Sequence, residues 1–355
     1  PINVSFDSSA VSDLGGAATG GTASLVASGG GVNLGTTMAN VSASAVQSGD
    51  SGTGPEKERG AAFATNEATP PSSTGGTIQF DVTDTVININ GDLLLNASAS
   101  RSEGNGALQG GTIAINANNG SLLVGDLISA NASADKFGVQ PGEVRGGSIT
   151  ALVSNNGDIL ASAMEYDANA VSGGDTFGGA VSLTTNSGGR IRSTGTIGVD
   201  ASAMTRALES AGDAVGGNIV VNINSGSLQS GPLVLDANAL GGDAIFGGSG
   251  GSALGGSARV NISGGDSVIE SLRLTTDATG GRGGLGNGGA GGAATAGTSE
   301  INITNGVVRT AGLVISSAAT GGNGGEGTLG GGGAVATGGP AAVMTSDAAT
   351  LVFMK

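Results

Sequence analysis

The segment GGTIAINANNGSLLVGDLISANAS, residues 110–133, contains the pattern that decides the fold. After its glycine pair, Ile113, Ile115 and Ala117 alternate with polar or small residues, and an Asn-Asn-Gly turn follows. Two more short runs of β-type residues complete the segment. Because side chains of a strand alternate between two faces, the segment predicts three short strands joined by tight turns.

The same pattern recurs along the chain. Residues 216–239, GGNIVVNINSGSLQSGPLVLDANA, and residues 296–319, AGTSEINITNGVVRTAGLVISSAA, align with the first segment. From Gly75 onward, successive units begin 32 to 42 residues apart. The units begin at Gly20, Gly75, Gly110, Gly146, Gly178, Gly216, Gly255, Ala296 and Gly338. One such unit cannot bury its apolar face alone, whereas stacked units share a continuous core. We therefore expect an all-β protein, a parallel β-helix solenoid.

The repeat also predicts how the chain is divided. We expect a single domain over residues 1–355, with an N-terminal strand or partial coil at 1–19 and a C-terminal partial coil at 338–355. Residues 20–337 would form about eight coils of three short strands, with an insertion at about 49–74. The segments between units would stack as loops on one edge of the rod.

Two inward columns and one outward column follow from the alternation in the third run of each unit. Large aliphatic residues form the first inward column, at Leu93, Ile128, Met164, Ile197, Leu233, Leu274 and Val314. Alanines form the second, at Ala97, Ala132, Ala168, Ala201, Ala237, Ala278 and Ala318. An Asn/Asp column of opposite parity should face outward, at Asn96, Asn131, Asp167, Asp200, Asp236 and Asp277.

Composition excludes several classes of function. The net charge of −15 opposes binding to nucleic acid. No apolar run reaches the length of a membrane span, and the first residues lack the pattern of a signal peptide. Glycine makes up 72 of 355 residues, aromatic residues are 2%, and cysteine is absent, so the core must be aliphatic and free of disulfides.

The sequence offers few of the residues that enzymes use for catalysis. Without His or Cys, a Ser-His-Asp triad, a thiol nucleophile and the usual zinc ligands are excluded. Arg190, Arg192 and Arg206 share a unit with Asp200, but no spacing organises them into a site. We expect no enzyme. The alternative is a polysaccharide-acting β-helix enzyme, whose cleft would be lined by Asp, Arg and the single tyrosine, Tyr166.

Two binding functions remain as alternatives. Asp167, Asp200, Asp236 and Asp277 would bring carboxylates close together, which Ca²⁺ could bridge or water could solvate. Calcium is the only cofactor that the sequence suggests. A column of Thr and Ser follows the glycine pairs and resembles an ice-binding array, although Ala180 and Asn218 interrupt it. Its members are Thr22, Thr77, Thr112, Ser148, Ser257 and Thr298.

The late loops are rich in glycine, such as GGRGGLGNGGAGGAATAG from Gly280. They are either flexible linkers or extended glycine helices that hydrogen-bond laterally to their neighbours. Both ends of the chain look like uncapped strands, with apolar residues at Ile2, Val4, Phe6, Leu351, Val352 and Phe353. The chain is therefore either a part of a longer exoprotein or a unit whose ends stack head-to-tail.

The order of glycine pair, alternating strand, Asn-Gly or Ser-Gly turn, second strand and Asp/Asn-Ala resembles the repeat regions of filamentous-haemagglutinin-like adhesins and large bacterial exoproteins. That resemblance covers the chain from Gly20 onward and implies a right-handed β-helix at a bacterial surface. We expect a secreted or surface-exposed rod for adhesion, matrix or filament formation. Its partners would be copies of itself, and cell-surface glycans or neighbouring surfaces.

Overall fold

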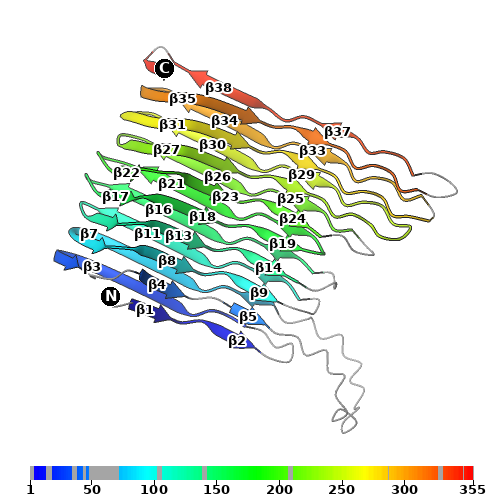
Figure 1. Cartoon of the computed structure of the whole chain (residues 1–355), viewed down its shortest axis with the longest axis horizontal. Coiled ribbons are helices and arrows are strands. Elements are labelled where there is room, and N and C mark those ends of the chain that lie inside the picture. The colour runs from blue at the N-terminus through cyan, green and yellow to red at the C-terminus, as the bar shows by residue number, and fades with distance from the viewer. Residues whose placement is uncertain are drawn as a thin grey trace, which may run out of the picture.

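A computed structural model describes residues 4–12, 18–33, 38–42, 45–47, 72–101, 106–137, 142–206, 211–286, 288–326, 331–346 and 348–354. The described chain is an all-β parallel solenoid, and every strand pairing in it is parallel. Figure 1 shows the coils stacked in chain order from the N-terminal to the C-terminal end. The expected fold class is confirmed.

One coil illustrates the arrangement. β11 (Thr112–Asn118), β12 (Ser121–Val124) and β13 (Leu127–Asn131) lie in one wide sheet. β14 (Ala134–Lys136) and β15 (Val144–Arg145) then join two narrow sheets. The coil therefore has five strands where three were expected, because residues assigned to loops form the two narrow sheets.

The other strands repeat this plan. The wide sheet has 22 strands; besides those above it holds β1 (Val4–Asp7), β3 (Thr22–Asn33), β4 (Met38–Ser42), β7 (Thr77–Ile89), β8 (Asp92–Asn96), β16 (Ser148–Ser154), β17 (Asp158–Ala161), β18 (Ala163–Asp167), β21 (Ala180–Thr185), β22 (Arg190–Ser193), β23 (Ile197–Asp200), β26 (Asn218–Ile223), β27 (Ser227–Asp236), β30 (Ser257–Ile262), β31 (Asp266–Thr275), β34 (Thr298–Ile303), β35 (Gly306–Ser316), β38 (Ala341–Thr345) and β39 (Ala349–Phe353). The first narrow sheet, of nine strands, adds β2 (Ala10–Ser12), β5 (Ala45–Gln47), β9 (Ala99–Arg101), β19 (Ala170–Ser172), β24 (Ala203–Thr205), β28 (Ala239–Leu240), β32 (Ala278–Thr279) and β36 (Ala319–Thr320). The second, of eight strands, adds β6 (Ser73–Thr74), β10 (Leu108–Gln109), β20 (Thr176–Phe177), β25 (Ala214–Val215), β29 (Ala253–Leu254), β33 (Ala294–Thr295) and β37 (Ala336–Thr337).

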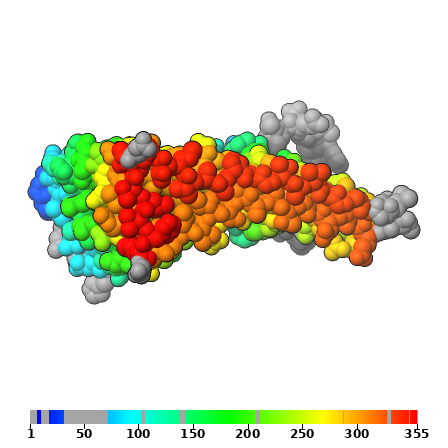
Figure 2. Space-filling view, turned by 90° about the horizontal axis from the view of Figure 1, so that it is seen from above, coloured from blue at the N-terminus to red at the C-terminus, as the bar shows by residue number. Residues whose placement is uncertain are grey.

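The first narrow sheet takes one strand from each coil, so its nine strands differ slightly from the expected eight coils. Most of the predicted insertion at 49–74 lies outside the described residues, which resume at residue 72. Figure 2, viewed along the stack, shows a long cross-section that is broad at one end and narrow at the other.

Aliphatic columns fill the broad end. Ile78, Ile113, Ile149 and Val181 lie on one another in the ladder of the first strands, and each is at most 1% exposed. Their polar neighbours in sequence face outward, as the alternation requires. Burying each such side chain contributes about 1.5–3 kcal/mol, so the repeated column is the main source of stability.

Four members of the predicted inward columns were misplaced: Leu274 and Val314 in the aliphatic column, and Ala278 and Ala318 in the alanine column, whose ladder positions are held by Thr276 and Ser317. Leu233 pairs with Leu272, and Leu272 pairs with Leu313. Leu274 is buried but pairs with Leu235, whereas Val314 is 56% exposed on the outer side. In the later coils, no residue is inserted between the glycine pair and the third strand, so the distance from the glycine pair sets the strand register. Aligning the units on their Asp-Ala dipeptide gives a wrong register, because Ala278 pairs with Ala239 and not with Ala237.

The glycine pairs mark the place where opposite walls of the coil touch. The amide of Gly111 donates to the carbonyl of Ala97 at 2.7 Å, and that of Gly147 donates to Ala132 at 2.8 Å. A Cβ on Gly110 would collide with the carbonyl oxygen of Ala132, and one on Gly147 with that of Gly111. The pair is therefore required by main-chain contact, besides any turn it makes.

The glycine-rich segments extend this contact into the narrow end of the molecule. Gly251 donates to Gly242, Gly281 to Gly251 and Gly292 to Gly281, each at 2.8 Å. These bonds cross between the outgoing and returning segments and also climb from coil to coil. Among the described residues, the predicted lateral hydrogen bonds between glycine-rich segments are present, so these residues do not form a flexible linker.

Candidate functional site

The predicted acidic column is shorter than expected. Asp167, Asp200 and Asp236 lie directly on one another at the outer ends of β18, β23 and β27. The next position of this column is Thr275, not Asp277. Asp277 lies two residues further on, beyond the end of β31, because the ladder register of this coil is set by its glycine pair. The four predicted ligands are therefore not one column.

Neighbouring side chains and amides already bind these carboxylates. Asp200 accepts bonds from the Ser202 amide and from Nδ2 of Asn169, both at 3.0 Å. Oγ1 of Thr275 donates to Asp236. Asp277 accepts from Oγ of Ser316 at 2.6 Å. Across the described ranges, no group of three or more acidic side chains could hold a metal ion. The calcium interpretation therefore gains no support from the geometry.

Burial and mutual repulsion make this column sensitive to protons. Burial, followed by the charges of Asp200 and Glu165, raises the pKa of Asp167 to about 6. Burial also raises the pKa of Asp200, against the opposing effect of its bonds from Ser202 and Asn169. These shifts follow from stacking half-buried carboxylates in adjacent coils.

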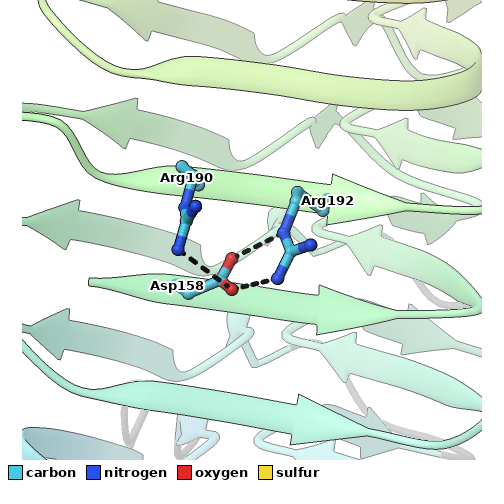
Figure 3. A network of polar contacts seen from close by, with 3 residues as sticks. All are labelled: Asp158, Arg190 and Arg192. Carbon is cyan, nitrogen blue, oxygen red and sulfur yellow. Dashed lines mark hydrogen bonds and ion pairs between the residues drawn. The ribbon is translucent and has the colours of Figure 1, made fainter. Parts of the chain in front are cut away.

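An ion-pair cluster links two other coils. Asp158 in β17 lies beneath Arg190 and Arg192 of β22 (Figure 3). Nε of Arg192 donates to Oδ1 of Asp158 at 2.9 Å, and its Nη2 binds the other carboxylate oxygen. Nη2 of Arg190 lies 3.7 Å from that oxygen. The Asp158 side chain is only 5% exposed, and its hydrogen bonds raise the pKa of Arg192.

The arginines thus gather around Asp158, which sequence reasoning did not single out, and not around Asp200. Arg206 lies elsewhere: Nη1 donates to the carbonyl of Lys136 at 2.8 Å, and Nη2 is 3.1 Å from Oδ1 of Asp135. Its guanidinium also lies over the ring of Phe137. The sequence analysis missed this cluster because Asp158 and Arg190 pair between coils. That pairing can be predicted only when the exact strand register is known.

Tyr166 does not line a cleft. Its side chain is fully buried in the aliphatic core, and this burial raises its pKa. Its hydroxyl lies 3.5 Å from the sulfur of Met164, within the same strand. The arrangement of Asp, Arg and Tyr that would favour a polysaccharide-acting enzyme is therefore not formed around this residue.

A shallow groove of about 550 Å³ runs along the stack over the glycine pairs. Its floor is main chain whose amides already bond to adjacent coils or to the opposite wall, from Gly110 to Gly256. One wall is the predicted Thr/Ser column, and the ladder confirms that Ala180 and Asn218 interrupt it. Thr112 and Ser148 belong to the same wall.

Ladders of asparagine were not predicted. Nδ2 of Asn261 donates to Oδ1 of Asn222, and Nδ2 of Asn302 donates to Oδ1 of Asn261, both at 3.0 Å. The recurring Asn-Ile dipeptide at the end of these strands was the available signal. Each rung ties one coil to the next on the outer surface.

The predicted end residues fall into different places. Ile2 lies outside the described residues, and Val4 and Phe6 belong to β1. At the other end, Leu351 packs partly buried on the core, and Phe353 is 59% exposed. Val352 shares the outward register of Arg309, so it lies on the flank of the last coil.

No known protein family, curated protein or solved structure matches the chain. In the part of the chain that the structure describes, no helix could cross a membrane.

Proposed function

We propose that this protein is a structural or adhesive rod outside the bacterial cell, and that it acts without catalysis. The observation that carries this proposal is the use of outward polar side chains as links between coils. The asparagine ladder, the bond from Asn169 to Asp200 and the Asp158 cluster all join adjacent coils. Such links stiffen a stack, which is what a rod requires.

Several features support a location outside the cell and a role at surfaces. The repeat order resembles that of surface exoproteins, and the absence of cysteine makes the fold independent of redox conditions. The net charge of −15 keeps rods apart laterally and soluble. Glycans of a cell surface, or neighbouring cells, are the contacts we propose for its flanks.

Retention on polysaccharide surfaces tests this function. Beads coated with the chain should be retained on immobilised bacterial or host polysaccharides more strongly than beads coated with an unrelated acidic protein. The bound polysaccharide should release no reducing ends or unsaturated sugars. Release of either product would contradict the non-catalytic role, and retention equal to that of the control protein would contradict adhesion.

The Asp158→Asn variant, which keeps the side-chain shape, serves as a matched control for the arginine cluster. If the cluster only links coils, the variant should be retained like the unmodified chain, with lowered stability. Product release that disappears in this variant would instead assign the cluster a catalytic role.

A further inference from the structure

Two adjoining hollows lie on the wide sheet, where the second strand of a coil leads into the third. The larger hollow, of about 410 Å³, takes its lining residues from the coils of β17, β22, β27 and β31. The smaller hollow, of about 270 Å³, takes them mainly from the coils of β7, β12 and β17. Leu160 and Thr194 line both, so the two hollows are neighbours along the stack.

One outward column of the ladder follows both hollows. Its successive members are Asn88, Leu123, Leu160, Arg192, Gln229 and Val268. With a spacing of about 4.8 Å between adjacent strands, this column spans roughly 24 Å along the stack. The hollows therefore suit an extended ligand that lies across the strands.

Hydrogen-bonding groups of both kinds line the larger hollow. Arg192 uses Nε and Nη2 in its ion pair (Figure 3), and its Nη1 takes no part in that pair. Gln229 adds an amide, and Glu270 adds a carboxylate. Leu160 and Val268 flank Arg192 and Gln229 in the column, so apolar surface lies beside the polar groups.

A buried hydroxyl without a partner lies in the lining of the larger hollow. Ser230 is 6% exposed, and within the described chain its Oγ makes no hydrogen bond. One coil below, Oγ of Ser193 donates to the carbonyl of Ser162 at 3.0 Å. Because a buried polar group without a partner is costly, Ser230 has an unused hydrogen bond to offer a ligand.

The charges of the larger hollow favour a neutral ligand with many hydroxyls. An anionic ligand would meet Glu270, and a cationic ligand would meet Arg192. A hydroxyl both donates and accepts, so adjacent hydroxyls can satisfy a guanidinium, an amide and a carboxylate together. A peptide strand along the column would lie across strands whose main chain is already paired with adjacent coils. A linear neutral polysaccharide meets both the length and the chemistry.

We propose that the two hollows form one binding site for a linear neutral polysaccharide, which lies along the stack across the wide sheet. The polar side chains of the larger hollow hydrogen-bond the sugar hydroxyls, and Leu160 and Val268 contact the C–H faces of the sugar rings. This proposal rests on the proposed adhesive function and adds the class of glycan and the place on the flank where it binds.

Calorimetric titration with soluble oligosaccharides tests the site. The probes are linear β-1,4-linked hexamers of glucose, mannose and galactose, and a hexamer of galacturonic acid. At least one neutral hexamer should bind more tightly than the acidic hexamer. Ser230→Ala should weaken that binding about fivefold, because one hydrogen bond to the ligand is lost. Its thermal stability should not fall, since the Ser230 hydroxyl has no hydrogen bond in the described chain to lose.

Ser257→Ala is the matched control. Oγ of Ser257 is also buried without a hydrogen-bond partner in the described part of the chain, but Ser257 lines neither hollow. This substitution should leave the affinity for the neutral hexamer unchanged. Equal weakening by the two substitutions, no binding of any neutral hexamer, or tighter binding of the acidic hexamer would overturn the proposal.

Bead retention separates failure of this site from failure of the adhesive role. If beads coated with the chain are retained above the acidic control protein while no neutral hexamer binds, the site is wrong and the adhesive role stands. If a neutral hexamer binds with the expected loss in Ser230→Ala while the beads are not retained, the site stands and the adhesive role is wrong.

Discussion

At the scale of the residue, glycine has a role in this protein that composition alone does not reveal. Gly111, Gly147 and Gly217 all have ordinary backbone torsions, yet a Cβ at each would overlap main-chain oxygens of neighbouring coils. The walls of the coil meet there through amide-to-carbonyl bonds. At these three positions glycine is needed for close main-chain contact and not for a left-handed turn.

Substituting Gly147 tests this role. Gly147→Ala should destabilise the protein by about 3 kcal/mol, because the methyl group meets the backbone of Gly111 and Ala132 and neither can move freely. Urea unfolding measures the change. The matched control is Gly198→Ala in β23, where the nearest heavy atom is 4.0 Å away. The control should be neutral or slightly stabilising; equal losses would refute the close-contact account.

The carboxylate column predicts an unusual dependence of stability on pH. The pKa of Asp167 in the folded protein, about 6, lies above that of an unfolded aspartate, so the folded state binds the proton more tightly. This contribution to stability is fully present below about pH 4 and is lost as pH rises through about 6. The Asp200 carboxyl, also raised, acts in the same direction.

Asp167→Asn should therefore stabilise the protein at pH 7.5 by about 1 kcal/mol, a figure reduced for partial solvent screening. The gain should shrink at pH 4, where the native aspartate is protonated. Asp277→Asn, whose carboxylate accepts two hydrogen bonds, provides the contrast and should not stabilise. Thermal unfolding of the three proteins at both pH values decides; a gain for Asp167→Asn that is larger at pH 4 would contradict the account.

At the scale of the element, strands are held to their neighbours by side-chain ladders as well as by main-chain pairing. Asn261 is the middle rung of a ladder and bonds both Asn222 and Asn302, whereas Asn222 takes part in one of these bonds. Short strands such as β30 have few main-chain bonds, so each rung adds a measurable share.

Asn261→Ala should cost about 2 kcal/mol, because two amide bonds are lost, and Asn222→Ala about half as much. The comparison of the two unfolding free energies measures the ladder itself, since both residues lie at the same position of adjacent strands. Equal losses would show that the rungs act independently of their place in the ladder.

The sequence predicted the long strands of the wide sheet but not the two-residue strands of the second narrow sheet. Alternation such as Ile113-Ile115-Ala117 was long enough to fix both the strand and its inward face. The strands of the second narrow sheet, such as β15 and β29, have two residues each, too few for alternation to be visible. The arginine cluster was missed for another reason: Asp158 and Arg192 meet only through pairing between coils.

At the scale of the whole molecule, the repeated coil yields a long, narrow cross-section (Figure 2). One part of it holds the aliphatic core, and the other holds hydrogen-bonded glycine. Such a body gives broad flanks for contact with other surfaces.

The central claim is that the chain folds into parallel coils that stack in register along one axis. X-ray diffraction from crystals of the purified chain tests it most directly. We predict parallel strands stacked about 4.8 Å apart along that axis, with Asp158 paired with Arg190 of the adjacent coil. Antiparallel strand pairing, or a register that separates Asp158 from Arg190, would contradict the account.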